Sequence, residues 1–244
     1  MRVITIIPAA GLGTRMAGAS AAKAGGAAVK PATSKQFTEL GGVPVILHTL
    51  RRFVAAPRVN EIFVALRIAE AGNFRARLEQ EHFPKPIHLV EGGEHRQESV
   101  ANALAAVQAD DNDIVLVHDA VRPFVAQEII ANVIAAVEKH GAAIAGVPAV
   151  DTIKLVDRSA ENALITSTVP RERAVLAQTP QGFRFGLLRK AMADALAQGF
   201  TGTDEASLVE RLGDEVAVVM GSPRNFKITT PGDLELAEFY VAKP

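Results

Sequence analysis

Short apolar runs alternate with segments of helical period along residues 1–150 of the chain. Residues 3–7 and 114–117 are apolar without alternation, as in strands that are buried on both faces. Strands that alternate with helices form a mostly parallel, doubly wound sheet with helices on both faces, so the pattern predicts an α/β fold. It predicts strands at residues 3–7, 61–66, 87–90, 114–117 and 142–148, and helices at 44–56, 69–80, 97–108 and 127–139.

The alternation of strands and helices stops after Val150. Residues 152–156 and 163–169 are short β-like pieces between polar or proline breaks, and the pattern predicts that residues 151–182 leave the sheet. A length of 244 residues fits one large domain or two small ones, and we expect residues 1–244 to form one domain. Helical periodicity returns at residues 185–198, 204–212 and 231–241, with a strand at 216–220.

The composition excludes several classes of protein. Without cysteine the chain has no disulfide scaffold, thiolate metal site or cysteine nucleophile, which fits a reducing, cytoplasmic compartment. Its 26 Lys and Arg against 27 Asp and Glu give a formal net charge of −1, which argues against binding nucleic acid through its phosphates. The apolar runs are shorter than the ~20 residues that span a bilayer, so we expect no membrane segment and no signal peptide.

The charge is unevenly distributed along the chain. Residues 1–38 carry five basic side chains and no acidic one, a charge of +5, whereas the rest of the chain carries −6. Positive charge concentrated in one segment favours an anionic ligand that is held locally.

A glycine-rich segment, Pro8-Ala9-Ala10-Gly11-Leu12-Gly13-Thr14-Arg15-Met16, follows directly after the first predicted strand. Glycines let backbone N–H groups approach phosphates, and Arg15 adds a cationic fork. Met16 stands where the dinucleotide fingerprint needs a third glycine, and no Gly-Lys-Ser/Thr follows for a Walker A loop. Phosphate binding is favoured over a plain strand-to-helix turn, and the Ala-, Gly- and Lys-rich residues 17–33 are predicted to be a mobile loop.

This segment and six later blocks resemble a known family. Residues 9–16 with Lys35-Gln36-Phe37 are similar to nucleotidyltransferases that activate sugar or polyol phosphates. Over the whole chain and in the same order, the later blocks resemble the 2-C-methyl-D-erythritol 4-phosphate cytidylyltransferases. They are Glu91-Gly92-Gly93-Glu94-His95-Arg96-Gln97-Glu98-Ser99-Val100, His118-Asp119-Ala120-Val121-Arg122-Pro123, Asp151-Thr152-Ile153-Lys154, Gln178-Thr179-Pro180-Gln181, Thr203-Asp204-Glu205-Ala206-Ser207 and Asn225-Phe226-Lys227-Ile228-Thr229.

The resemblance implies a Rossmann-like nucleotidyltransferase sheet with a protruding β-arm. It implies transfer of CMP from CTP to 2-C-methyl-D-erythritol 4-phosphate with release of pyrophosphate, a step of non-mevalonate isoprenoid precursor biosynthesis, with Mg²⁺ as cofactor. It assigns Arg15 and Lys35 to catalysis, as cations on the triphosphate. Lys23 and Lys30 lie between these two, so the lysine that contacts the triphosphate is left open.

The resemblance also implies a set of binding residues for each substrate. The residues expected to bind the nucleotide are Pro8, Ala9, Ala10, Gly11, Gly13, Gly93, Glu94, Ser99 and Ala120. Those expected to bind the polyol phosphate are Asp119, Arg122, Thr152, Arg171, Thr179, Thr203 and Lys227, and Asp119 is also the expected Mg²⁺ ligand.

The residues themselves leave alternatives beside these roles. Asp119 and Arg122 follow the apolar run 114–117, at the sheet edge where α/β folds bind ligands, but the two could instead form a surface ion pair. Ser99 lies in the first turn of a predicted helix, where a plain capping role is the alternative. His118 is predicted to be structural, because an ionised phosphate attacks without a general base.

The segment of the family that matches residues 151–177 is an arm exchanged with a second subunit. The resemblance therefore implies a homodimer in which Thr152 and Arg171 serve the partner's site, and the alternative is an edge hairpin within one subunit. Two other functions remain open: a ribitol 5-phosphate cytidylyltransferase, whose motifs overlap, and a non-catalytic nucleotide-binding module. Arg171 and the block at residues 203–207 favour the methylerythritol phosphate enzyme.

Overall fold

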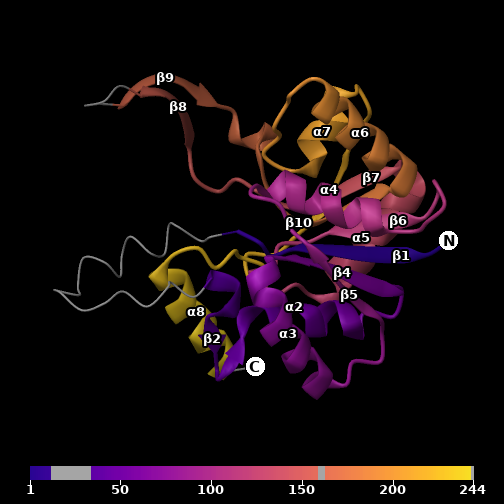
Figure 1. The fold of residues 1–244 in the computed structure, drawn as a ribbon. Coiled ribbons are helices and arrows are strands. Elements are labelled where there is room, and N and C mark those ends of the chain that lie inside the picture. Colours follow the sequence, from indigo (N-terminus) through magenta and orange to yellow (C-terminus); the bar gives the residue numbers. More distant parts are fainter. Residues whose placement is uncertain (12–33, 159–162, 243–244) are drawn as a thin grey trace.

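The computed structural model describes residues 1–11, 34–158 and 163–242, and it has a seven-stranded sheet at its centre (Figure 1). The predicted loop at residues 17–33 lies outside the described residues. In spatial order the strands are β11 (Ala217–Met220), β7 (Ala142–Pro148), β10 (Val175–Arg184), β6 (Ile114–Val117), β1 (Val3–Pro8), β4 (Glu61–Leu66) and β5 (Ile87–Glu91).

The sheet is mostly parallel, as predicted. Strands β6, β1, β4 and β5 pair in parallel, and so do β11 and β7. Strand β10 is antiparallel to both of its neighbours, β6 and β7. The carboxyl ends of the parallel strands share one edge of the sheet. Because β10 runs the other way, its amino-terminal part lies at that same edge.

Helices cover both faces of the sheet because its central strands are apolar on both sides. Along β1, Val3 and Ile7 face one hydrophobic core, and Ile4 and Ile6 face the other. The first core packs against α2 (Val45–Ala55), α3 (Ile68–Glu81) and α5 (Gln127–His140). The second packs against α4 (Arg96–Ala106), α6 (Phe185–Ala197) and α7 (Glu205–Arg211).

A third, smaller core lies beside the sheet. It joins α8 (Pro231–Ala242) to the hairpin of β2 (Glu39–Leu40) and β3 (Val43–Pro44), through Leu40, Val121 and Ile228. The 3-10 turn η1 (Lys35–Phe37) precedes this hairpin. Neither the hairpin nor η1 was predicted from the sequence, since both are too short to show a period. None of the helices within the described ranges is long and apolar enough to cross a membrane.

Every predicted helix and strand is present, with ends that differ by at most two residues. The prediction that residues 151–182 leave the sheet is wrong for its last part, because β10 runs through the middle of the sheet. Its apolar pattern is broken by Gln178, Pro180 and Gln181, around a register shift between Ala177 and Gln181. This interruption hides a buried strand from a search for hydrophobic runs.

Strands β8 (Ile153–Arg158) and β9 (Ala163–Val169) form an antiparallel hairpin that projects from the body of the molecule (Figure 1). We call this hairpin the arm. The predicted segment 151–177 is slightly longer than the projecting part, because Val175 already pairs with β7. Apolar side chains of the arm are exposed, with Leu164 71% and Ile165 65% accessible.

Candidate active site

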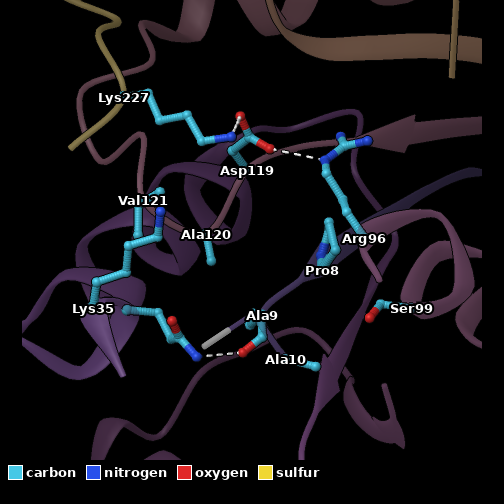
Figure 2. A pocket seen from close by; sticks show the side chains of 12 residues that line it. Pro8, Ala9, Ala10, Lys35, Arg96, Ser99, Asp119, Ala120, Val121 and Lys227 are labelled. Carbon is cyan, nitrogen blue, oxygen red and sulfur yellow. Dashed lines mark hydrogen bonds and ion pairs between the residues drawn. The ribbon is translucent and has the colours of Figure 1, made fainter. Parts of the chain in front are cut away.

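Two adjoining pockets lie at the edge where β1 and β6 end. Arg96, Asp119 and Lys227 line both of them. The first pocket is lined by Pro8, Ala9, Ala10, Gly11, Lys35, Gln36, Arg96, Ser99, Asp119, Ala120, Val121 and Lys227 (Figure 2). The second pocket is lined by Arg96, Asp119, Arg122, Ala177, Gln178, Thr179, Gln181, Thr203, Asp204 and Lys227.

The backbone that follows β1 forms one wall of the first pocket and is held from several sides. The N–H of Ala9 donates to the carbonyl of Ala65 on β4 at 2.8 Å. The carbonyl of Ala9 accepts from Gln36 Nε2 at 2.5 Å, and the carbonyl of Ala10 accepts from Arg67 Nε at 2.8 Å. Residues 8–11, the described part of the glycine-rich segment, therefore line the pocket in a fixed position, and η1 brings Lys35 to the same space.

The turn before α4 packs closely against this wall. A Cβ on Gly92 would lie 2.4 Å from the Cβ of Ala10, so only glycine fits there. Ser99 Oγ accepts from the N–H of Gly93 at 3.1 Å and lies 3.1 Å from the carbonyl of His95, to which it can donate. Ser99 thus closes the turn, as the capping alternative expects, and also lines the first pocket.

Asp119 is the centre of the charges between the two pockets. Its Oδ1 lies 3.2 Å from Arg96 Nε, and its Oδ2 lies 3.1 Å from Arg122 Nε and 3.0 Å from Lys227 Nζ. Figure 2 shows Arg96 and Lys227 reaching this carboxylate from different elements. Asp119 and Arg122 do pair with each other, but the pair does not lie on the surface as the alternative from the sequence expects, since the Asp119 side chain is only 8% exposed and pairs with three cations.

These cations determine the ionisation of Asp119. Burial alone would raise the pKa of Asp119, but Arg96, Lys227 and Arg122 outweigh it and hold that pKa well below the usual range of a carboxyl group. Arg96 also pairs with Glu205, whose two oxygens lie 2.7 and 2.8 Å from Arg96 Nη1. Burial raises the pKa of Glu205, and Arg96 opposes this shift. We call Arg96, Asp119, Arg122, Glu205 and Lys227 the Asp119 cluster.

His118 is held in a chain of hydrogen bonds beneath the cluster. The N–H of Asp119 donates to Thr179 Oγ1 at 3.1 Å, and Thr179 Oγ1 lies 3.0 Å from His118 Nδ1. His118 Nε2 lies 3.1 Å from the carbonyl of Arg122, which can only accept. The carbonyl of Arg122 requires the proton on Nε2, and burial lowers the pKa of His118 to about 4, so the ring is neutral near pH 7 and its Nδ1 accepts from Thr179 Oγ1. His118 orients its neighbours and lines neither pocket.

The bulge in β10 is tied to the loop that carries Lys227. Asn225 Nδ2 donates to the carbonyl of Thr179 at 2.7 Å and to Gln178 Oε1 at 3.1 Å. The carbonyl of Asn225 accepts from Arg122 Nη1 at 2.7 Å. The second pocket is thus built by loops far apart in the sequence that bond to one another.

The structure brings most of the predicted site residues together. Of the other residues predicted for the nucleotide, Ala120 lines the first pocket, and Gly93 donates its N–H to Ser99, which lines it. Glu94 does not line this pocket, and Gly13 lies outside the described residues. Arg15, Lys23 and Lys30 also lie outside them. Asp119, Arg122, Thr179, Thr203 and Lys227 all line the second pocket.

Thr152 and Arg171 are the predicted residues that the structure leaves apart from the others. Both are exposed at the base of the arm, and neither lines either of the two pockets described above. Arg171 Nη1 donates to the carbonyl of Val150 at 3.2 Å, and its Nε lies 3.7 Å from Glu172 in solvent.

Sequence reasoning missed Arg96, Glu205 and Gln36. Arg96 carried a signal, because it is the first residue of α4, where the helix macrodipole disfavours a cation. A cation in that position indicates carboxylates nearby. Glu205 lies 109 residues further along the chain, and nothing local marks it as buried.

The described residues do not form a metal site by themselves. No group of three or more His, Cys, Asp or Glu side chains comes together among them. Asp119 is the acidic side chain that lines the first pocket, and both of its oxygens already face cations. A divalent ion bound mainly by protein oxygens therefore does not fit this donor set.

Comparisons with known proteins agree with this architecture. The family profile described as "IspD: 2-C-methyl-D-erythritol 4-phosphate cytidylyltransferase" matches residues 3–243. A curated protein of that name from Acidobacterium capsulatum is 58% identical, covering 99% of this chain and 98% of the relative, and one from Solibacter usitatus is 48% identical, covering 99% and 96%. The crystal structure of 4-diphosphocytidyl-2C-methyl-D-erythritol synthase from Anaerococcus prevotii is 29% identical, covers 99% of both chains and superposes with a TM-score of 0.81. The chain belongs to the 2-C-methyl-D-erythritol 4-phosphate cytidylyltransferase family.

Proposed function

We propose that the two adjoining pockets hold the two substrates side by side, CTP in the first pocket and 2-C-methyl-D-erythritol 4-phosphate in the second. As a member of its family, the chain is a nucleotidyltransferase that transfers CMP from CTP to this acceptor and releases pyrophosphate, in the non-mevalonate route to isoprenoids. The observation that carries the proposal is that Arg96, Asp119 and Lys227 line both pockets. Phosphates bound on either side therefore meet at shared charges.

The protein itself forms no covalent bond in this reaction. An oxygen of the acceptor phosphate attacks the α-phosphorus of CTP, the bond from that phosphorus to the bridging oxygen breaks, and pyrophosphate leaves with the electron pair. The attacking phosphate is already ionised, so positioning and charge stabilisation carry the catalysis. We assign the triphosphate to Lys35 and to the backbone at residues 9–11, and Arg15 keeps its predicted role.

The acceptor phosphate is assigned to the cations of the second pocket. Lys227 is partly exposed, and its Nζ can leave or share Asp119 to meet an incoming anion. Arg122 is more buried and held by Asp119 and Asn225, so it acts as a fixed wall. The hydroxyl of Thr203 lines the same pocket and suits a polyol hydroxyl.

Mg²⁺ is proposed to accompany the nucleotide, bound mainly to phosphate oxygens and water. The predicted role of Asp119 as a ligand has to compete with its three cationic partners. The concentration of Mg²⁺ needed for half-maximal activity, measured for the Asp119→Asn variant at saturating CTP, tests this role. An unchanged Mg²⁺ requirement removes Asp119 from the coordination of the metal.

A homodimer is proposed because Thr152 and Arg171 are exposed at the base of the arm and do not line the second pocket. We infer that they complete the acceptor site of a second copy. Mixing Arg171→Ala and Lys35→Ala proteins should then restore activity, since a hybrid dimer has one site with both residues intact. No recovery, when exchange of subunits is demonstrated, contradicts shared sites.

The substrate assignment is tested by offering CTP with either methylerythritol phosphate or ribitol 5-phosphate and measuring pyrophosphate. The family profile and the relatives reported above name the former, so we expect a large preference for it. Binding of CTP without turnover of either acceptor would revive a non-catalytic nucleotide-binding module. A cytoplasmic location stays a prediction from the cysteine-free composition.

A further inference from the structure

Glu205 is a buried carboxylate that lines neither pocket and yet belongs to the Asp119 cluster. It lies in the first turn of α7, its side chain is 1% exposed, and both of its oxygens face Arg96 Nη1 at 2.7 and 2.8 Å. Burying a carboxylate costs free energy of hydration, and a cation close by can offset that cost. Here Arg96 is that cation.

Arg96 is in turn bound at two points. Its Nη1 meets Glu205, and its Nε donates to Asp119 Oδ1 at 3.2 Å. It stands at the first residue of α4, where the helix dipole repels a cation, so the two carboxylates hold it in place. Arg96 therefore links α4, the loop after β6, and α7 across the boundary between the two pockets.

We propose that Glu205 is a positioning residue, which fixes the guanidinium of Arg96 so that Asp119 remains aligned between the two pockets. Arg96 occupies Oδ1 of Asp119, which leaves Oδ2 to hold Lys227 and Arg122 on the acceptor side. The inference rests on the proposed division of the pockets between CTP and the acceptor. Glu205 acts through Arg96 and touches neither substrate.

The net charge of the cluster shows why the negative charge of Glu205 matters for Arg96. Three cations face two carboxylates, so the cluster keeps one net positive charge for the acceptor phosphate. Without the charge of Glu205, Arg96 keeps only its contact with Asp119, and the cluster gains one uncompensated positive charge beside the first pocket. Arg96 then turns toward the triphosphate, and CTP is bound at least as tightly but in an unproductive position.

The test compares Glu205→Gln, which removes the charge and keeps the shape, with Glu205→Asp, which keeps the charge. For Glu205→Gln we expect kcat with the acceptor to fall about 10- to 100-fold, as for residues that orient the groups around a metal. The Kd for CTP, measured by calorimetry without acceptor, should be unchanged or lower. Glu205→Asp should recover part of kcat. A weaker CTP affinity that parallels the loss of kcat overturns the proposal, because general loss of structure lowers both.

A double-variant comparison identifies the route of the effect. If Glu205 acts through Asp119, the Glu205→Gln/Asp119→Asn protein is no slower than Asp119→Asn alone, whereas independent effects multiply. Multiplied losses overturn the proposal. Arg96→Lys keeps the positive charge but cannot bridge both carboxylates. It should likewise lower kcat without weakening CTP binding, so the proposal can be tested even if the Glu205→Gln protein folds poorly.

The matched control is Glu61→Gln. Glu61 also pairs with an arginine and is largely buried, but it begins β4 at the opposite end of the sheet from the pockets. Its kcat and CTP affinity should equal those of the unaltered chain. If the unaltered chain does not turn over methylerythritol phosphate with CTP, the proposed function fails, whatever the Glu205 variants do.

Discussion

The Asp119 cluster and the arm present polar side chains in opposite ways. In the cluster, both oxygens of Asp119 and both of Glu205 meet cations, and the two carboxylate side chains are 8% and 1% exposed. At the base of the arm, Arg171 and Glu172 are 3.7 Å apart and both lie in solvent. The cluster is ready before any ligand arrives, whereas the arm residues have no such support within one subunit.

The apolar residues of the two regions differ in the same way. Every residue of β6, the strand that leads to Asp119, is buried, but Leu155, Leu164 and Ile165 of the arm are exposed. A monomeric protein seldom projects such a hairpin into water. The difference agrees with the proposal that one subunit binds the nucleotide and that the arm is covered by a second copy.

Removing the carboxylate of Asp119 should have the largest effect. Asp119→Ala leaves the three cations without their shared partner, so we expect the free energy of unfolding to fall by about 3–5 kcal/mol. We expect kcat/KM to fall about 10²- to 10³-fold. Urea titration and a pyrophosphate assay measure the two losses.

The control for Asp119 is Asp111, which pairs with Arg189 on the surface. Asp111→Ala should change the free energy of unfolding by less than about 1 kcal/mol and leave turnover intact. Equal effects of the two substitutions would show that burial of the cluster has no energetic consequence.

The pH dependence of stability should report His118. Between pH 6.5 and about 4 the unfolded chain binds a proton on this histidine and the folded chain does not, so stability falls as the pH is lowered through this window. The shift corresponds to about 3 kcal/mol in total. Urea titrations at several pH values should show this loss in the unaltered chain and a shallower one in His118→Asn. The exposed His140→Asn should follow the unaltered chain. If the His118→Asn curve runs parallel to that of the unaltered chain, the folded protein protonates His118 as readily as the unfolded chain does.

Exposed apolar residues of the arm should affect activity more than stability. Leu164→Ser/Ile165→Ser removes apolar surface that one subunit leaves in solvent, so the unfolding of the subunit itself should change little. If a second copy covers the arm, the apparent mass by light scattering falls by half and kcat/KM for the acceptor falls about 10-fold or more.

Leu196→Ser offers the matched comparison, since Leu196 is 81% exposed on α6. It should alter neither mass nor turnover. A dimer that survives both arm substitutions would place the subunit interface elsewhere.

Two glycines give the smallest and most local comparison. Gly92→Ala forces a Cβ within 2.4 Å of Ala10, so we expect a loss of about 1–3 kcal/mol and weaker CTP binding. Gly72→Ala places its Cβ in open space on α3 and should stabilise the chain by about 0.5–1 kcal/mol. Thermal unfolding and CTP calorimetry of both proteins measure the contrast. Tolerance of Gly92→Ala would mean that the wall of the first pocket is not held tightly.

The periodicity of the sequence predicts the layers of the fold well, because each strand and helix buries a face that its own residues define. Periodicity does not predict β10. Its buried Gln178 and Gln181 bond to Ser222, Asp204 and Ala206, so the strand has polar side chains where the pattern expects apolar ones. Because β10 contributes polar side chains to the site, it lacks the apolar run by which a buried strand is recognised.

The sequence predicts the part of the candidate site that directly follows a recognisable strand. Asp119 and Arg122 follow an apolar strand, and that position alone places them at the ligand edge. Arg96 and Glu205 meet across 109 residues, a pairing that only the folded chain reveals. The identity of the nucleotide came from resemblance and then from the comparisons, since no single residue in the pockets encodes cytosine.

The order β7, arm, β10 has a consequence for how this fold can be altered. β7 and β10 are antiparallel neighbours, and the N–H of Ala149 donates to the carbonyl of Ala174 at 3.0 Å across the base of the arm. In topology the arm is therefore an enlarged hairpin turn, and the entropy of closing such a turn changes slowly with its length. Grafting a short turn between Ala149 and Ala174 should leave every sheet pairing in place, so the arm can be lengthened, shortened or exchanged as a module.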